Sequence, residues 1–241
     1  AVYSAYVDIV NSNFTNHHVG FGNFTWGDET FTQSGGAVYG HEGYVYDSNF
    51  INNSVFSGGA IDFTYIEVYD STFKDNEAIY GGAIASAAEC YIEYSNFTAN
   101  NATKGGAIYC NDSNLTVGAC NFSNNTANGE YSVGGAIYFD GNDLLIADSK
   151  FISNEAEDCG AVAANSATTE IRNTEFVENG AYDCGAIEVS SGDVLIDNCT
   201  FDSNYANRSI AALALHSNAT VNNTIFKSNR AEDNGALFYE S

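Results

Sequence analysis

The sequence predicts an all-β protein, a right-handed single-stranded parallel β-helix of about nine coils of 23–29 residues with a longer, irregular first coil. Three observations carry this prediction: a Phe-x-x-Asn motif that recurs every 23–29 residues, a Gly-Gly-Ala motif between its copies, and a Val or Ile five residues before each Phe. A fixed period of this size is typical of stacked-repeat proteins. We expect residues 1–241 to form one β-helix domain.

The Phe-x-x-Asn motif sets the register of the predicted coils. It occurs at Phe50/Asn53, Phe73/Asn76, Phe97/Asn100, Phe122/Asn125, Phe151/Asn154, Phe176/Asn179, Phe201/Asn204 and Phe226/Asn229. Phe14 fits the pattern but is followed by His17 in place of Asn, so it begins a divergent first coil. Equal positions become neighbours when coils stack. We therefore expect a column of stacked Phe rings and a ladder of Asn amides that bond the next coil and the turn backbone.

The other two motifs mark bends and a further inward column. The Gly-Gly-Ala motif begins at Gly35, Gly58, Gly81, Gly105 and Gly134, and its later variants are Cys159-Gly160-Ala161, Cys184-Gly185-Ala186, Ser209-Ile210-Ala211 and Asn234-Gly235-Ala236. The aliphatic column is Ile9, Val45, Val68, Ile92, Val117, Ile146, Ile171, Ile196 and Val221. Period-2 alternation around these positions predicts strands of about three to five residues, with glycine supplying the bends.

Two segments interrupt the repeat. Residues 15–34 hold Phe21, Phe24, Trp26 and Phe31, an aromatic density that a solvated loop does not normally expose. Two interpretations are open: a flap over the first coil, or a contact with a partner or a carbohydrate. Residues 127–133 are expected to form a short loop insertion.

Composition excludes several classes of function. Seven Lys and Arg against 31 Asp and Glu give a formal charge of −24, which repels nucleic acid. The same charge makes surface-bound calcium the expected counter-ion, and no cofactor is predicted. No apolar run is long enough for a transmembrane segment, and no leader precedes Ala1, so we expect a mature secreted product or a fragment.

The six cysteines are best interpreted through the repeat. Cys159 and Cys184 occupy the same position in adjacent coils, which places their Cα atoms about 4.8 Å apart, within disulfide range. Cys90 and Cys110 flank a turn in neighbouring coils and are the second disulfide candidates. Cys120 and Cys199 replace the Ser or Thr two residues before the repeat Phe, and are expected to be buried thiols.

Other candidate residues concern modification and catalysis. The sequons that begin at Asn13, Asn96, Asn101, Asn121 and Asn198 are candidates for N-glycosylation. The rival enzymatic reading is a β-helix polysaccharide lyase or hydrolase, which needs paired carboxylates or a carboxylate with a basic residue on one face. The carboxylates form no recognisable motif and the basic residues are dispersed. No catalytic and no metal-binding residue is therefore predicted, and the His17-His18 pair is read as part of a polar loop.

The two motifs together also resemble a known repeat. Phe73-Lys74-Asp75-Asn76 with Gly81-Gly82-Ala83-Ile84 resembles the repeats of chlamydial polymorphic outer membrane proteins and of adhesin-like surface proteins of methanogenic archaea, over residues 36–240. The resemblance implies a right-handed β-helix, secretion, and a role in adhesion or in the cell envelope. Acidity, the absence of Pro and the many sequons favour an archaeal envelope protein.

The sequence thus predicts an extracellular structural protein of the cell envelope, a subunit of a sheath, surface layer or filament. The repeat continues through Leu237, Phe238 and Tyr239, so we expect an open strand edge there that pairs with another copy end to end. The alternative is an adhesin-like surface protein that presents aromatic residues or glycans to a partner. The expected partners are the protein itself, glycans and other envelope proteins.

Overall fold

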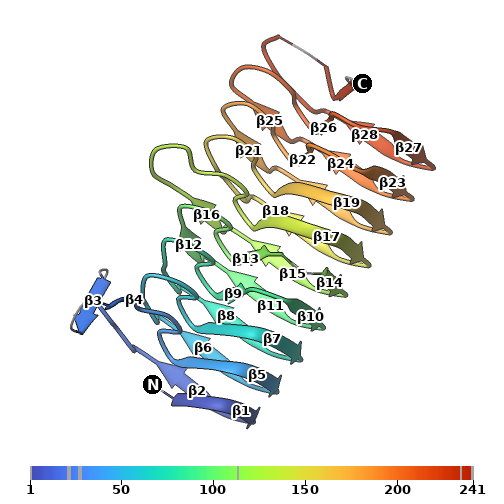
Figure 1. Cartoon of the computed structure of the whole chain (residues 1–241). Coiled ribbons are helices and arrows are strands. Elements are labelled where there is room, and N and C mark those ends of the chain that lie inside the picture. Colours follow the sequence, from blue (N-terminus) through green and yellow to red (C-terminus); the bar gives the residue numbers. More distant parts are fainter. Residues whose placement is uncertain (1, 21–22, 27–28, 113, 234, 240–241) are drawn as a thin grey trace.

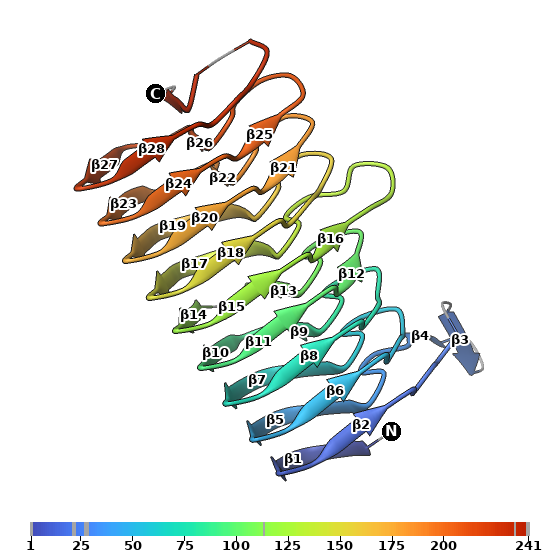
Figure 2. The same cartoon turned by 180° about the vertical axis from the view of Figure 1, so that it is seen from behind.

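The computed structural model describes residues 2–20, 23–26, 29–112, 114–233 and 235–239, and shows a right-handed parallel β-helix, as predicted (Figure 1). The coils stack into a rod, with the N- and C-terminal coils at opposite ends (Figure 2). The pairings between the described strands are parallel, apart from one short antiparallel hairpin. No helix among these residues is long and apolar enough to cross a membrane.

One side of the rod is a nine-stranded sheet that carries the repeat Phe. Its strands are β2 (Asn13–Thr15), β6 (Asn49–Ile51), β8 (Thr72–Lys74), β11 (Asn96–Thr98), β15 (Asn121–Ser123), β18 (Lys150–Ile152), β20 (Glu175–Val177), β24 (Thr200–Asp202) and β28 (Ile225–Lys227). The Phe column is confirmed, because successive rings from Phe14 to Phe226 stack with centroids 4.6–5.0 Å apart and interplanar angles of 2–11°.

The other side is a 14-stranded bent sheet. Its strands are β1 (Val2–Val10), β5 (Val38–Tyr46), β7 (Ile61–Tyr69), β9 (Ile84–Ser86), β10 (Glu89–Glu93), β13 (Ile108–Asn111), β14 (Asn114–Gly118), β17 (Ile137–Ala147), β19 (Val162–Arg172), β22 (Ile187–Val189), β23 (Asp193–Asp197), β26 (Leu213–Leu215), β27 (Ala219–Asn222) and β29 (Leu237–Tyr239). The expected strand length of three to five residues was wrong for five coils. Their strands run 9–11 residues, because the backbone stays extended through the position at which other coils bend. In the next coil after β7, the bend at Ala87 and Ala88 separates β9 from β10.

Short strand pairs lie after the Asn ladder in four coils. They are β12 (Asn101–Ala102) with β16 (Thr126–Ala127), and β21 (Gly180–Ala181) with β25 (Tyr205–Ala206). The Ala residues of these strands are buried.

The Asn ladder is confirmed as the second inward column. Asn100 shows the pattern: its Nδ2 donates to the Phe73 carbonyl at 3.0 Å and to Asn125 Oδ1 at 2.9 Å, and its Oδ1 accepts from the backbone N–H of Asn76. His17, which replaces Asn in the divergent first coil, still donates its backbone N–H to Asn53 Oδ1 at 3.1 Å. The ladder therefore satisfies turn groups that burial would otherwise leave unpaired.

A parallel ladder of hydroxyl and thiol groups lies two residues before each Phe. The backbone N–H of Ser71 donates to Ser95 Oγ, that of Ser95 to Cys120 Sγ, and that of Cys120 to Ser149 Oγ. The prediction that Cys120 and Cys199 are buried at this position is confirmed. What the sequence did not indicate is that their sulfur atoms accept hydrogen bonds from the neighbouring coil.

The Gly-Gly-Ala motif has two separate requirements. The first Gly has positive φ, as at Gly81 (+61°), and the second packs against the next coil, so that a Cβ on Gly82 would lie 2.1 Å from the Gly106 carbonyl oxygen. The predicted alignment of the Ser209 variant was wrong by one residue. Hydrogen bonding from Gly185 N to the Ile210 carbonyl aligns residues 210–212 with residues 184–186, because the preceding loop is one residue longer.

The central part of each insertion leaves the stack, whereas the ends pair with neighbouring coils. Residues 15–34 contain β3 (Asn23–Trp26) and β4 (Glu29–Thr32), an antiparallel hairpin that stands out from the side of the rod in both views (Figures 1 and 2). At the ends of the predicted insertion 127–133, Ala127 belongs to β16 and Val133 pairs with Lys104. The residues between them form a loop in which Tyr131 is exposed and its backbone N–H donates to Glu157 Oε2 at 2.9 Å.

Candidate functional site

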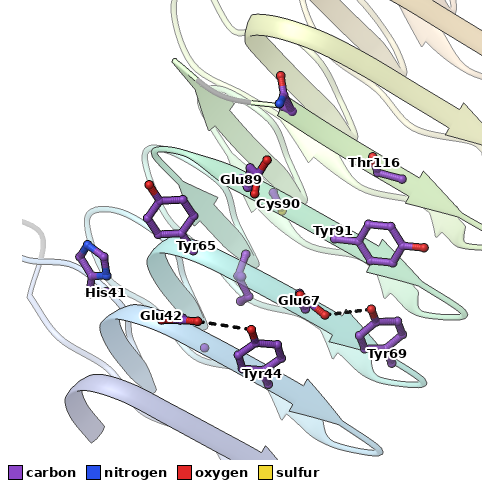
Figure 3. Close-up of a pocket in the computed structure, with 13 residues that line it drawn as sticks. His41, Glu42, Tyr44, Tyr65, Glu67, Tyr69, Glu89, Cys90, Tyr91 and Thr116 are labelled. Carbon is purple, nitrogen blue, oxygen red and sulfur yellow. Dashed lines mark hydrogen bonds between the residues drawn. The ribbon is translucent and has the colours of Figure 1, made fainter.

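One hollow among the described residues is a groove on the outer face of the 14-stranded sheet, which we call the tyrosine–glutamate groove. It crosses four coils and has a volume of about 540 Å³ (Figure 3). Its lining residues are His41, Glu42, Gly43 and Tyr44 from β5, Tyr65, Ile66, Glu67 and Tyr69 from β7, Glu89, Cys90 and Tyr91 from β10, and Asn114 and Thr116 from β14.

Strand alternation places these side chains. In β7, Ile66 and Val68 point into the core and are buried, so Tyr65, Glu67 and Tyr69 face outward. The parallel register then puts Tyr44, Glu67 and Tyr91 in one row across successive coils. Aromatic and carboxylate groups therefore follow one another along the rod at about the 4.8 Å spacing of paired strands.

Each of three successive coils holds a carboxylate against a phenol two residues away. Tyr44 donates to Glu42 at 3.3 Å and Tyr69 donates to Glu67 at 2.9 Å (Figure 3). In β10 the order is reversed, and Tyr91 donates to Glu93 at 2.6 Å. A phenol that donates to a carboxylate fixes the orientation of both groups, so Glu42 and Glu67 present ordered negative charge beside the aromatic rings of the groove, whereas Glu93 does not line it.

The phenols are held in their neutral form. Burial, with the Glu67 hydrogen bond, raises the pKa of Tyr69, and the hydrogen bond to Glu93, with burial, raises the pKa of Tyr91 to about 12. The nearby charge of Glu67 is the main cause that raises the pKa of Tyr44. The groove is thus a site of negative potential in which the rings remain hydrogen-bond donors at neutral pH.

A second hollow of about 560 Å³, which we call the acidic groove, lies further along the same sheet. Two of its carboxylates, Glu157 and Asp158, come from one coil, and Asp183 and Glu188 come from the next. Burial followed by the charge of Asp183 raises the pKa of Asp158. Burial also raises the pKa of Glu188, whose Oε1 lies 3.4 Å from His216 Nε2. Sequence reasoning missed this cluster, although Asp158 and Asp183 each directly precede a Cys-Gly-Ala variant and therefore occupy the same position in adjacent coils.

The chain's own cations occupy the acidic groove. Lys104 Nζ lies 4.9 Å from the ring centroid of Tyr138, and the Arg208 guanidinium lies 5.2 Å from that of Tyr182. Arg208 also forms an ion pair with Asp183. Within the part of the chain that the structure describes, no group of three or more His, Cys, Asp or Glu side chains is arranged to hold a metal ion.

Residues 62–230 match the family described as the right-handed β-helix region. The chain belongs to the right-handed β-helix family. No curated protein and no solved structure matches it.

The β-helix brings both candidate cysteine pairs together. The backbones of Cys159 and Cys184 pair on adjacent coils, as their repeat positions predicted. Both side chains lie in a small apolar cluster with Ile210. The thiols of Cys90 and Cys110 contact each other inside the main core, and this contact, with burial, raises the pKa of Cys90 well above its usual range. All six cysteines are buried, and the structure contains them as thiols. The two disulfides therefore stay predictions.

The candidate glycosylation residues differ in their exposure. Asn13, Asn96, Asn121 and Asn198 are exposed on the outside of the β-helix. Asn101 is half-buried, and its side-chain oxygen is enclosed without a hydrogen-bond partner. Asn121 donates to Asn96 on the neighbouring coil at 3.1 Å, so glycans on both residues would compete for the same space.

The predicted assembly residues are only partly described. Phe21 lies outside the described residues, and the side chains of Phe24, Trp26 and Phe31 on the hairpin lie outside them too. Leu237 is 45% exposed in β29, which pairs with β26, and the side chains of Phe238 and Tyr239 lie outside the description. The hairpin and the tyrosine–glutamate groove are therefore separate candidate surfaces, and sequence reasoning missed the groove.

Proposed function

We propose that this protein is an extracellular, adhesin-like surface protein of the cell envelope, which binds a partner along the tyrosine–glutamate groove and is not an enzyme. The observation that carries the proposal is the row of oriented carboxylate–phenol pairs on successive coils. A rigid sheet that presents aromatic rings and fixed polar groups in a groove is suited to recognition of an extended ligand.

The paired geometry supports binding over catalysis. Glu42 and Glu67 each accept a hydrogen bond from a tyrosine of their own strand. Acid–base cleavage of a glycosidic bond uses two carboxyl groups that face each other across the bond. An extracellular location is supported by the exposed sequons and by the resemblance of the repeats to those of surface proteins.

Binding to three labelled probes tests the proposal: hexalysine, a neutral N-acetylglucosamine hexamer and an acidic oligogalacturonate. We expect at least one probe to bind the full chain, to lose that binding in the Tyr44→Ala/Tyr65→Ala/Tyr91→Ala variant, and to remain uncleaved by mass spectrometry. Tyr3→Ala/Tyr131→Ala is the matched control, because both rings are highly exposed and lie outside this groove. Cleavage of any probe would overturn the proposal, and so would equal binding of the probes by the parent and by the triple tyrosine variant.

A second candidate function is the structural subunit of a sheath, surface layer or filament, formed by end-to-end stacking. The supporting observation is the in-register repetition, because Phe stacks on Phe and Asn bonds Asn at successive steps, so a coil from another copy would meet the same ladders. Sedimentation and negative-stain microscopy at increasing protein concentration test it. Ordered polymers are expected, and a monodisperse monomer at every concentration would exclude this function.

A further inference from the structure

We propose that the ligand of the tyrosine–glutamate groove is an extended peptide segment that carries Lys or Arg side chains. The inference rests on the proposed binding function and adds the chemistry of the partner. Three features of the described residues lead to it: the sign of the charges in the groove, the ring faces beside them, and the way the chain fills its own second groove.

The charges of the groove are of one sign. Glu42, Glu67 and Glu89 line it from three successive coils, and among its described lining residues there is no Lys or Arg. The net charge of −24 adds a long-range negative field that concentrates cations near the surface. An anionic ligand would have to overcome both contributions, whereas a cationic ligand is favoured by both.

The rings beside these carboxylates complete a cation site. Tyr65 is 42% exposed, and its ring centroid lies 5.4 Å from that of His41 on the neighbouring coil. Tyrosine faces attract ammonium and guanidinium groups when the cation lies within about 6 Å of the ring centroid. A Lys or Arg side chain in the groove would contact a ring and a carboxylate together.

In the acidic groove, cations of this chain already contact the tyrosine rings and a carboxylate. There Arg208 lies over the Tyr182 ring and forms an ion pair with Asp183, and Lys104 lies over the Tyr138 ring. In the tyrosine–glutamate groove the carboxylates and rings come from this chain, and the cation is left for a partner to provide.

The shape of the groove favours a chain over a small amine. Four coils span about 14 Å, the length of about four residues of an extended peptide. The lining residues come from four successive coils, so a strand with cationic side chains can lie across them.

The test is fluorescence anisotropy with labelled hexalysine on the full chain, at low and at near-physiological salt. The groove variant is Glu42→Gln/Glu67→Gln/Glu89→Gln. The matched control is Asp75→Asn/Glu77→Gln/Glu178→Gln, which removes the same number of charges from exposed positions outside the groove. Thermal unfolding by circular dichroism verifies that both variants keep the fold.

We expect the groove variant to bind hexalysine at least roughly tenfold more weakly and the control within about twofold of the parent, with affinity falling as salt rises. Equal weakening in both variants would overturn the inference, because it would show attraction to net charge alone. Binding of the neutral hexamer, but not of hexalysine, with loss in the tyrosine variant would overturn the cationic ligand and keep the proposed function. No groove-dependent binding of any probe would overturn both.

Discussion

Replacing one Asn of the buried ladder tests the energetics of the β-helix most sharply, and Asn100→Ala is the substitution of choice. Asn100 lies near the middle of the described coils and is fully buried, as are its ladder neighbours Asn76 and Asn125. The substitution removes four hydrogen bonds: two that Asn76 donates to its Oδ1, and two that its Nδ2 donates to Phe73 and Asn125.

The expected cost follows from those four bonds. A buried hydrogen bond contributes a net of about 0.5–1.5 kcal/mol, and the partners left behind are enclosed and cannot turn to water. We therefore expect Asn100→Ala to lower the free energy of unfolding by about 4 kcal/mol. Asn121→Ala is the matched control, because it removes one exposed hydrogen bond, to Asn96, and should cost less than about 0.5 kcal/mol.

Urea unfolding followed by circular dichroism measures both values. The slope of the transition should be compared between variants, because a repeat array that loses cooperativity would change the slope as well as the midpoint. A loss below about 1 kcal/mol for Asn100→Ala, or a loss equal to that of the control, would refute the view that the amide ladder stabilises the stack.

Three further predictions concern packing, pH and redox state. Gly82→Ala should cost roughly 3 kcal/mol or more in urea unfolding, because its Cβ would overlap the Gly106 carbonyl oxygen. Burial raises the pKa of Asp62 to about 6, above its usual 3.8, so this carboxyl adds stability below about pH 4 that is lost as the pH rises through 6, and Asp62→Asn should remove that part of the pH dependence. Mild oxidation of the folded chain should lower the count of titratable thiols from six to two, through the bridges Cys159–Cys184 and Cys90–Cys110.

Each of these has a contradicting result, and the packing prediction also has a control variant. Gly118→Ala meets only the flexible Glu93 side chain, and a cost equal to that of Gly82→Ala would contradict the packing argument. An Asp62→Asn variant that keeps the parent's pH dependence of unfolding would show that Asp62 is not its source. Six thiols after oxidation, or a bridge that includes Cys120, would contradict the predicted pairing.

Most of the fold could be predicted because stacking copies a local pattern into space. The Phe and Asn columns and the partnership of Cys159 with Cys184 follow from repeat position alone. The predicted alignment near Ser209 was wrong because the sequence pattern alone does not distinguish an extra residue in the loop from a substitution within the motif. The hydrogen bond from Gly185 to the Ile210 carbonyl and the pairing of Cys184 with Ile210 fix it.

The candidate site was largely beyond sequence reasoning. Glu42, Tyr65 and Tyr91 are far apart in sequence and belong to no repeated motif, so nothing indicated that they share one groove. Their outward orientation could have been inferred from alternation with the buried Val45, Ile66 and Ile92. Each carboxylate–phenol pair occupies outward positions two residues apart on one strand, a pattern that is visible when the coils are aligned.

Zero-length carbodiimide cross-linking of hexalysine to the unmodified chain identifies the carboxylates that touch the bound cation. We expect cross-links concentrated on Glu42, Glu67 and Glu89, mapped by mass spectrometry and suppressed by unlabelled hexa-arginine. Cross-links spread equally over Asp75, Glu77 and Glu178 would contradict it, since they would show that the groove is no more a cation site than the rest of this acidic surface.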